Sequence, residues 1–134
     1  MSSLLFNVIT LLKSGIGSYL KANEQKRKEI GGLMLSISDC ISEAANSIRK
    51  SIYPHGKCAE MEMYANALDD IITPDILPNI GLAKVDLMNA SSIEHFINLE
   101  TSTSKEIIDT ANQLEQVAGG FRGIGNILTR GFKP

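Results

Sequence analysis

The spacing of apolar residues constrains this 134-residue chain more than any other feature. Over most of its length, aliphatic and alanine side chains recur in steps of three and four, the period that turns one face of an α-helix toward a core. No run of residues alternates apolar with polar side chains, so the sequence predicts no strands. We therefore expect an all-α protein.

Local signals divide this pattern into helical segments. Tyr53-Pro54-His55-Gly56 should end one helix, because proline disfavours helix in the residue before it. Thr103 with Glu106 forms a capping box that should begin another, and Ser91 with Glu94 forms a second box that would break a helix near residue 90. Since short connections favour antiparallel neighbours, we expect a four- to five-helix antiparallel bundle in one domain, 1–134. The expected helices cover about residues 3–22, 24–52, 58–72, 80–99 and 104–130.

Charge is unevenly distributed along the chain. Residues 1–28 carry a net charge of +4 and residues 116–134 carry +3, whereas residues 29–115 carry −9. The total of −2 is not basic enough for a dedicated DNA-binding protein, so we expect no nucleic-acid partner. The cationic ends and the acidic middle would instead select a protein partner, or the ends would meet an anionic membrane surface.

Most glycines of the terminal segments fall inside helical patterns, where each costs about 1 kcal/mol relative to alanine. One interpretation is close packing between the helices at 3–22 and 104–130. The other is membrane insertion, because Gly119-x-x-x-Gly123 has the small-residue spacing of membrane helix pairs. The candidate contacts with a membrane or a partner are Leu4, Phe6, Leu11, Lys13, Gly15, Gly17, Gly119, Arg122 and Gly123.

Candidate chemical groups are few, and we expect no catalytic site, no cofactor and no metal. His55 and Cys58 lack the second pair of ligands that a zinc site needs. Cys40 and Cys58 should be free thiols, because Cys40 would lie roughly 15 Å from the start of the next helix. Arg49 and His55, with five residues between them, resemble the R-x4–6-H motif of HEPN-type RNases, which are small helical bundles. That resemblance implies an RNase whose arginine and histidine converge in a groove.

The start of the chain carries a second resemblance. Leu4-Leu5-Phe6 through Ser14-Gly15-Ile16-Gly17, followed by a long helix, resembles the N-terminal bundles of cell-death and conflict-system proteins. Examples are the HeLo and Bell-type domains and the bundle of mixed-lineage kinase-like pseudokinases. The resemblance implies an apolar first helix that engages a membrane once it is released. The segment Pro54-His55-Gly56-Lys57-Cys58 is similar to loops of bacterial helical domains, which implies a bacterial source.

These observations lead to one expected function and two alternatives. We expect a non-enzymatic helical-bundle module for interaction or signalling, which acts through helix–helix association with itself or with a protein partner. The first alternative is a membrane-active effector that permeabilises membranes with its N-terminal helix, and the second is a HEPN-like RNase. Because no export signal precedes the apolar run and Lys13 interrupts it, we expect a cytoplasmic protein, either free or peripheral to a membrane.

Overall fold

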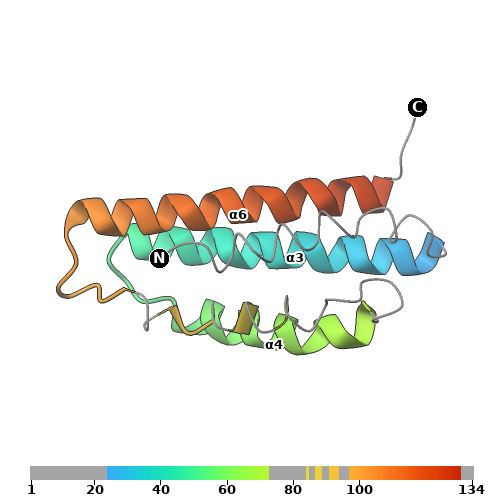
Figure 1. The fold of residues 1–134 in the computed structure, drawn as a ribbon, viewed down its shortest axis with the longest axis horizontal. Helices are drawn as coiled ribbons and strands as arrows, with labels where there is room; N and C mark the ends of the chain where they lie inside the picture. The colour runs from blue at the N-terminus through green and yellow to red at the C-terminus, as the bar shows by residue number, and fades with distance from the viewer. Residues whose placement is uncertain (1–23, 73–83, 85–86, 89–90, 94–96, 131–134) are drawn as a thin grey trace.

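The computed structural model describes residues 24–72, 84, 87–88, 91–93 and 97–130. Within these residues every regular element is helical, so the predicted all-α class is confirmed. The long helices are α3 (Glu24–Arg49), α4 (His55–Ile71) and α6 (Ser104–Arg130). α3 packs against both of the others and runs antiparallel to each of them (Figure 1).

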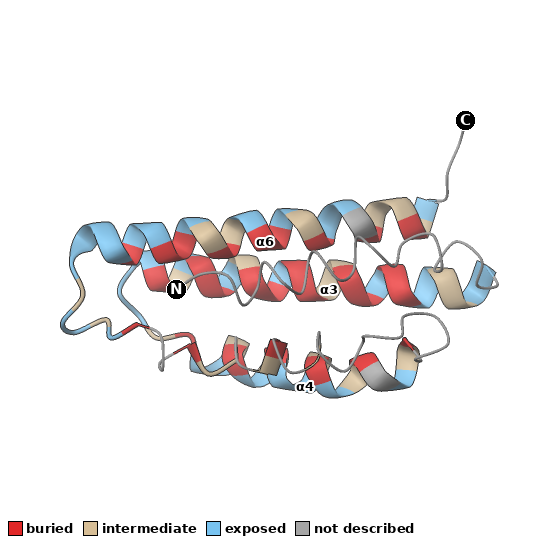
Figure 2. Ribbon diagram, viewed as in Figure 1, coloured by how far each residue is buried: buried red, intermediate tan, exposed pale blue. Residues whose placement is uncertain are grey.

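The core lies on the faces that the apolar spacing predicted. In α3, side chains at steps of three and four are fully buried, among them Ile30, Met34, Ile37 and Ile41. In α6 the largest fully buried side chain is Phe121. Figure 2 shows buried positions recurring along the sides of α3 and α6 that face each other. Burial of this apolar surface is the main favourable contribution to folding.

The end of α3 differs from the prediction, because the helix stops at Arg49 rather than near residue 52. The backbone N–H of Ser51 donates to the carbonyl of Ile48, and that of Ile52 donates to Ser47, each over 2.9 Å. This is the Schellman arrangement, in which the residue after the helix adopts a left-handed conformation. Ser51 takes that place with φ of 57°. The chain then turns away, and Ile52 is 58% exposed instead of extending the buried stripe.

The start of α4 is also earlier than predicted, at His55 rather than near residue 58. The sequence Tyr53-Pro54-His55-Gly56 ends no helix, since α3 has already stopped, and it begins the next one. Pro54 takes the N-cap position, and its carbonyl accepts a hydrogen bond of 2.9 Å from the N–H of Cys58. Proline is tolerated there because the N–H groups at a helix start have no partner inside the helix.

α6 begins at Ser104 and ends at Arg130, which confirms the predicted limits. The predicted capping box is present: the N–H of Thr103 donates to a Glu106 carboxylate oxygen over 2.8 Å, and the N–H of Glu106 donates to the Thr103 hydroxyl over 3.1 Å.

Between α4 and α6, the predicted helix at 80–99 does not continue to its end. Lys84, Leu87 and Met88 are helical, whereas residues 91–92 form a turn and residues 97–98 are irregular. The turn lies where the predicted break near residue 90 would place it. Glu94, the second member of that capping box, and the predicted helix at 3–22 lie outside the described residues.

Candidate functional site

The inward face of α6 is held against α3 by a close approach of the two backbones. A Cβ atom added at Gly125 would lie 2.8 Å from Leu35 Cγ and 3.0 Å from the carbonyl oxygen of Gly31. One added at Gly31 would lie 3.0 Å from both Leu128 Cβ and the backbone nitrogen of Thr129. These two positions therefore have no room for a side chain, and close helix packing explains why they are glycine.

Polar contacts fix the register of α3 and α6 along their whole length. Arg27 Nη1 donates to the carbonyl of Leu128 over 2.6 Å, close to the last carbonyls of α6. Ser38 Oγ, which is fully buried, donates to the carbonyl of Ala118 over 2.7 Å. Arg49 Nη1 lies 3.4 Å from a Glu115 carboxylate oxygen near the other end of the pair. The inward face of α6 is thus committed to contacts within the chain.

The opposite side of α6 is exposed, and we call it the outward face. A Cβ atom added at Gly119 or Gly123 would meet no atom of the described residues within 4 Å. Ile108 is 50% exposed on the same side of the helix. Figure 2 shows exposed positions recurring along the side of α6 turned away from α3. The outward face consists of Lys105, Ile108, Asp109, Gln116, Gly119, Arg122, Gly123 and Arg130, all of which are exposed.

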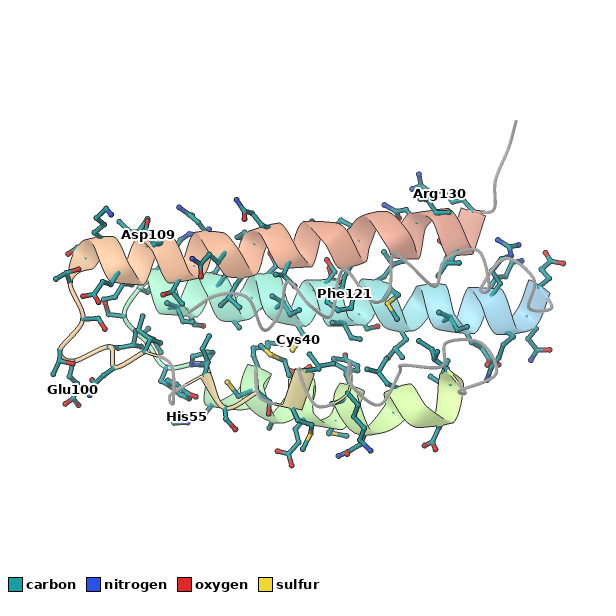
Figure 3. The ribbon with its side chains drawn as sticks, in the orientation of Figure 1. Cys40, His55, Glu100, Asp109, Phe121 and Arg130 are labelled. Carbon is teal, nitrogen blue, oxygen red and sulfur yellow. The ribbon has the colours of Figure 1, made fainter. Side chains whose placement is uncertain are left out.

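The two ends of the outward face differ in net charge, because its one carboxylate lies near the start of α6 and two arginines lie toward its end. Near its start, Asp109 lies 3.6 Å from Lys105 in an exposed pair one turn apart. Toward its end lie Arg122 and Arg130, and neither forms an ion pair among the residues that the structure describes. Figure 3 shows Asp109 and Arg130 on the side of α6 that faces away from α3.

The two thiols lie where the first turn of α4 packs against α3. Cys40 Sγ donates to the carbonyl of Lys57 over 3.2 Å, and Lys57 Nζ lies 2.5 Å from a Glu43 carboxylate oxygen and 2.8 Å from one of Glu60. Both cysteines are free, as predicted. The predicted separation of roughly 15 Å is nevertheless wrong, because α4 packs against α3 and the first turn of α4 lies beside Cys40.

Their surroundings shift the pKa values of two of these groups, Cys40 and Lys57. Burial, and then the negative charge of Glu60, raise the pKa of the Cys40 thiol to about 12. Since the thiolate is the nucleophilic form, this thiol is a poor nucleophile at neutral pH. Hydrogen bonds to Glu43 and Glu60 raise the pKa of Lys57 above its usual value. In the part of the chain that the structure describes, no three His, Cys, Asp or Glu side chains gather to hold a metal ion.

Arg49 and His55, the pair that resembles an RNase motif, take different partners. Arg49 points to α6, where its Nη2 donates to Asn112 Oδ1 over 3.2 Å in addition to its contact with Glu115. The His55 ring lies against Tyr53, with ring centroids 4.5 Å apart, at the start of α4 (Figure 3). Each side chain is therefore engaged in a local contact of its own.

The predicted contact residues are partly placed by the structure. Gly119, Arg122 and Gly123 come together on the outward face of α6. The other candidates lie outside the described residues: Leu4, Phe6, Leu11, Lys13, Gly15 and Gly17. Sequence reasoning missed the approach of Gly31 to Gly125, although a glycine inside the buried stripe of α3 was a signal for it. Among the described residues, no helix has the length and apolar content that crossing a membrane requires.

In comparisons with known proteins, no family model matches this chain, and no curated protein or solved structure matches it. The resemblances to cell-death bundles and to HEPN-type RNases therefore stay predictions.

Proposed function

We propose that this chain is a non-enzymatic interaction module that associates with another helix through the outward face of α6. The observation that supports this function is the pair of exposed glycines, Gly119 and Gly123, in the interior of a long helix. A helix-interior glycine costs about 1 kcal/mol relative to alanine. Among the residues that the structure describes, no atom lies close enough to either position to require glycine there. A partner helix would find no side chain there and would approach the α6 backbone closely, as helices do at small residues.

The proposed scaffold for this face is a four- to five-helix antiparallel bundle. It is supported by the antiparallel packing of α3 against α4 and α6. It is also supported by the helical residues Lys84, Leu87 and Met88, which lie between α4 and α6 in the sequence. A packed bundle holds α6 by its inward face and presents the outward face as a rigid surface. Rigid surfaces bind with less loss of conformational entropy than flexible ones.

The test compares two leucine substitutions at exposed, open glycines. Gly123→Leu places a side chain in the middle of the outward face, and Gly32→Leu places one on α3, where an added Cβ also meets nothing within 4 Å. Both remove a helix-interior glycine, so their effects on helix propensity match. Sedimentation velocity of the full chain, up to about 0.5 mM, should show association that Gly123→Leu weakens at least about tenfold, or ~1.4 kcal/mol. Gly32→Leu should leave it unchanged. Equal association of both variants would reject the outward face as the binding surface.

A second candidate, a membrane-active effector, is favoured by the position of the basic residues. The antiparallel packing brings the start of α3, with Lys26, Arg27 and Lys28, beside the end of α6, with Arg130. Basic clusters of this kind attract anionic lipid surfaces. Vesicles of phosphatidylserine and phosphatidylcholine should then bind the chain and leak, and Leu4→Glu/Leu11→Glu should abolish the leakage. If the wild type neither binds nor permeabilises these vesicles, this candidate is rejected.

A further inference from the structure

The outward face of α6 carries opposite charges at matched distances from its central glycine. Asp109 lies ten residues before Gly119, and Arg130 lies eleven residues after it. At 1.5 Å per residue these are about 15 Å and 16.5 Å along the helix axis. At about 100° per residue, Asp109 and Arg130 also lie within about 60° of each other around the helix. Both charges therefore lie within one sector of about 60° on the outward face.

We propose that a second copy of this chain occupies the outward face, with the two α6 helices packed antiparallel about a two-fold axis near Gly119. This inference rests on the proposed function and names its partner. In that arrangement, Arg130 of each copy lies beside Asp109 of the other, because the two residues are equally far from the axis. A two-fold contact of this kind uses the same surface on both copies and closes as a dimer.

Charge complementarity distinguishes this arrangement from a parallel one. Parallel helices in register would place Arg130 opposite Arg130 and Asp109 opposite Asp109, so that like charges face each other. The antiparallel arrangement replaces both repulsions with attractions and also opposes the two helix dipoles.

The residues between these charges suit close contact. Gly119 and Gly123 lie at the centre, where the two backbones would approach most closely, and within the described residues no side chain covers either glycine. Ile108, 50% exposed, would be covered near the aliphatic stem of Arg130 from the other copy. The existing pair of Asp109 with Lys105 is exposed at 3.6 Å, and such surface pairs exchange partners at little cost.

A dimer built on one helix face is small, so its affinity should be modest and sensitive to salt. Stable interfaces generally bury about 1,200 Å² or more. Exposed charge pairs weaken as ionic strength rises, with a screening length of about 10 Å at 0.1 M. We expect association to fall as sodium chloride is raised from about 0.05 M to 0.5 M.

The decisive experiment mixes two charge-reversal variants, Asp109→Arg and Arg130→Asp. Alone, each variant would place like charges at both ends of its dimer, so self-association should fall at least about tenfold. In the mixture, the two substituted side chains, of opposite charge, meet at one end of the dimer, and the unchanged Arg130 and Asp109 meet at the other. A mixed dimer should therefore form with about the wild-type affinity. Native mass spectrometry resolves the mixed dimer from both homodimers by mass, and Asp39→Arg, at an exposed carboxylate of α3, serves as the control.

The double variant Asp109→Arg/Arg130→Asp should self-associate like the wild type, because opposite charges again meet at both ends of its dimer. Its association would show that neither substitution prevents folding. If the mixture forms no mixed dimer and the double variant is not restored, while Gly123→Leu still weakens association, the antiparallel dimer is rejected and the proposed function stands. If association does not respond to Gly123→Leu, the proposed function is rejected as well. A chain that is monomeric at about 0.5 mM also rejects the dimer.

Discussion

The two faces of α6 use glycine for opposite reasons. On the inward face, Gly125 is required by its neighbours, because a Cβ atom there would lie 3.0 Å from the backbone oxygen of Gly31. On the outward face, no atom of the described part of the chain lies within 4 Å of a Cβ added at Gly119 or Gly123. One helix thus carries a glycine that its packing against α3 requires and two glycines that this packing does not require. The difference shows that a glycine's role depends on what lies opposite it, which helical spacing alone does not reveal.

The largest effect on stability should come from adding a side chain at Gly125, where α6 packs against α3. Gly125→Ala should lower the free energy of unfolding by about 1–3 kcal/mol, because the added methyl group overpacks the α3–α6 contact and the opposing Gly31 backbone cannot rotate away. Urea unfolding followed by circular dichroism measures this change. The control is Gly32→Ala, where an added Cβ meets nothing within 4 Å. Equal stability of the two variants would contradict the close approach of the backbones.

The start of α6 was predictable because its signal is local. Thr103 and Glu106 are three residues apart and cap the helix whatever surrounds it. The end of α3 was not predictable in this way, because the left-handed conformation is taken by Ser51 and not by the glycine or asparagine that usually marks it. The start of α4 was missed because Pro54 was interpreted as a helix breaker, although it precedes the first turn.

The candidate surface was partly predictable for a related reason. Spacing alone placed Gly119 and Gly123 on one side of a helix, since residues four apart share a face. The register between α3 and α6 decides which side of α6 faces solvent. It also decides that Gly125 lies against Gly31. Side chains far apart in sequence set that register, such as Ser38 with its hydrogen bond to Ala118. No local pattern contains this information.

An intermediate effect on stability should follow from removing the hydrogen bond between Ser38 and Ala118. Ser38→Ala removes a buried hydrogen bond of 2.7 Å to the carbonyl of Ala118, and it should lower the free energy of unfolding by about 1 kcal/mol. The variant leaves the outward face untouched, so association through that face should be unchanged for the folded fraction. Urea unfolding and sedimentation velocity measure the two properties separately. A loss of association without a loss of stability would mean that the two faces are not independent.

A smaller effect of opposite sign should come from the outward face. Gly119→Ala should raise the free energy of unfolding by up to about 1 kcal/mol, because alanine favours helix and the added methyl group meets no neighbour. Stability must be measured at low protein concentration, where association does not contribute. Destabilisation by Gly119→Ala would show that this glycine, like Gly125, is required within the chain.

The smallest effect on stability should come from the capping box at the start of α6. The backbone N–H of Thr103, which donates to the Glu106 carboxylate, holds the pKa of Glu106 below its usual value. Because the folded-state pKa is lowered, this contact stabilises the fold fully above the ordinary pKa of about 4.5 and is lost as pH falls through the folded-state value. Glu106→Gln keeps a side chain that can accept the hydrogen bond but does not titrate. Its stability should therefore decrease less than that of the wild type between pH 6 and pH 3, as measured by thermal unfolding. Parallel acid profiles for the two proteins would show that the charge of Glu106 does not contribute to the cap.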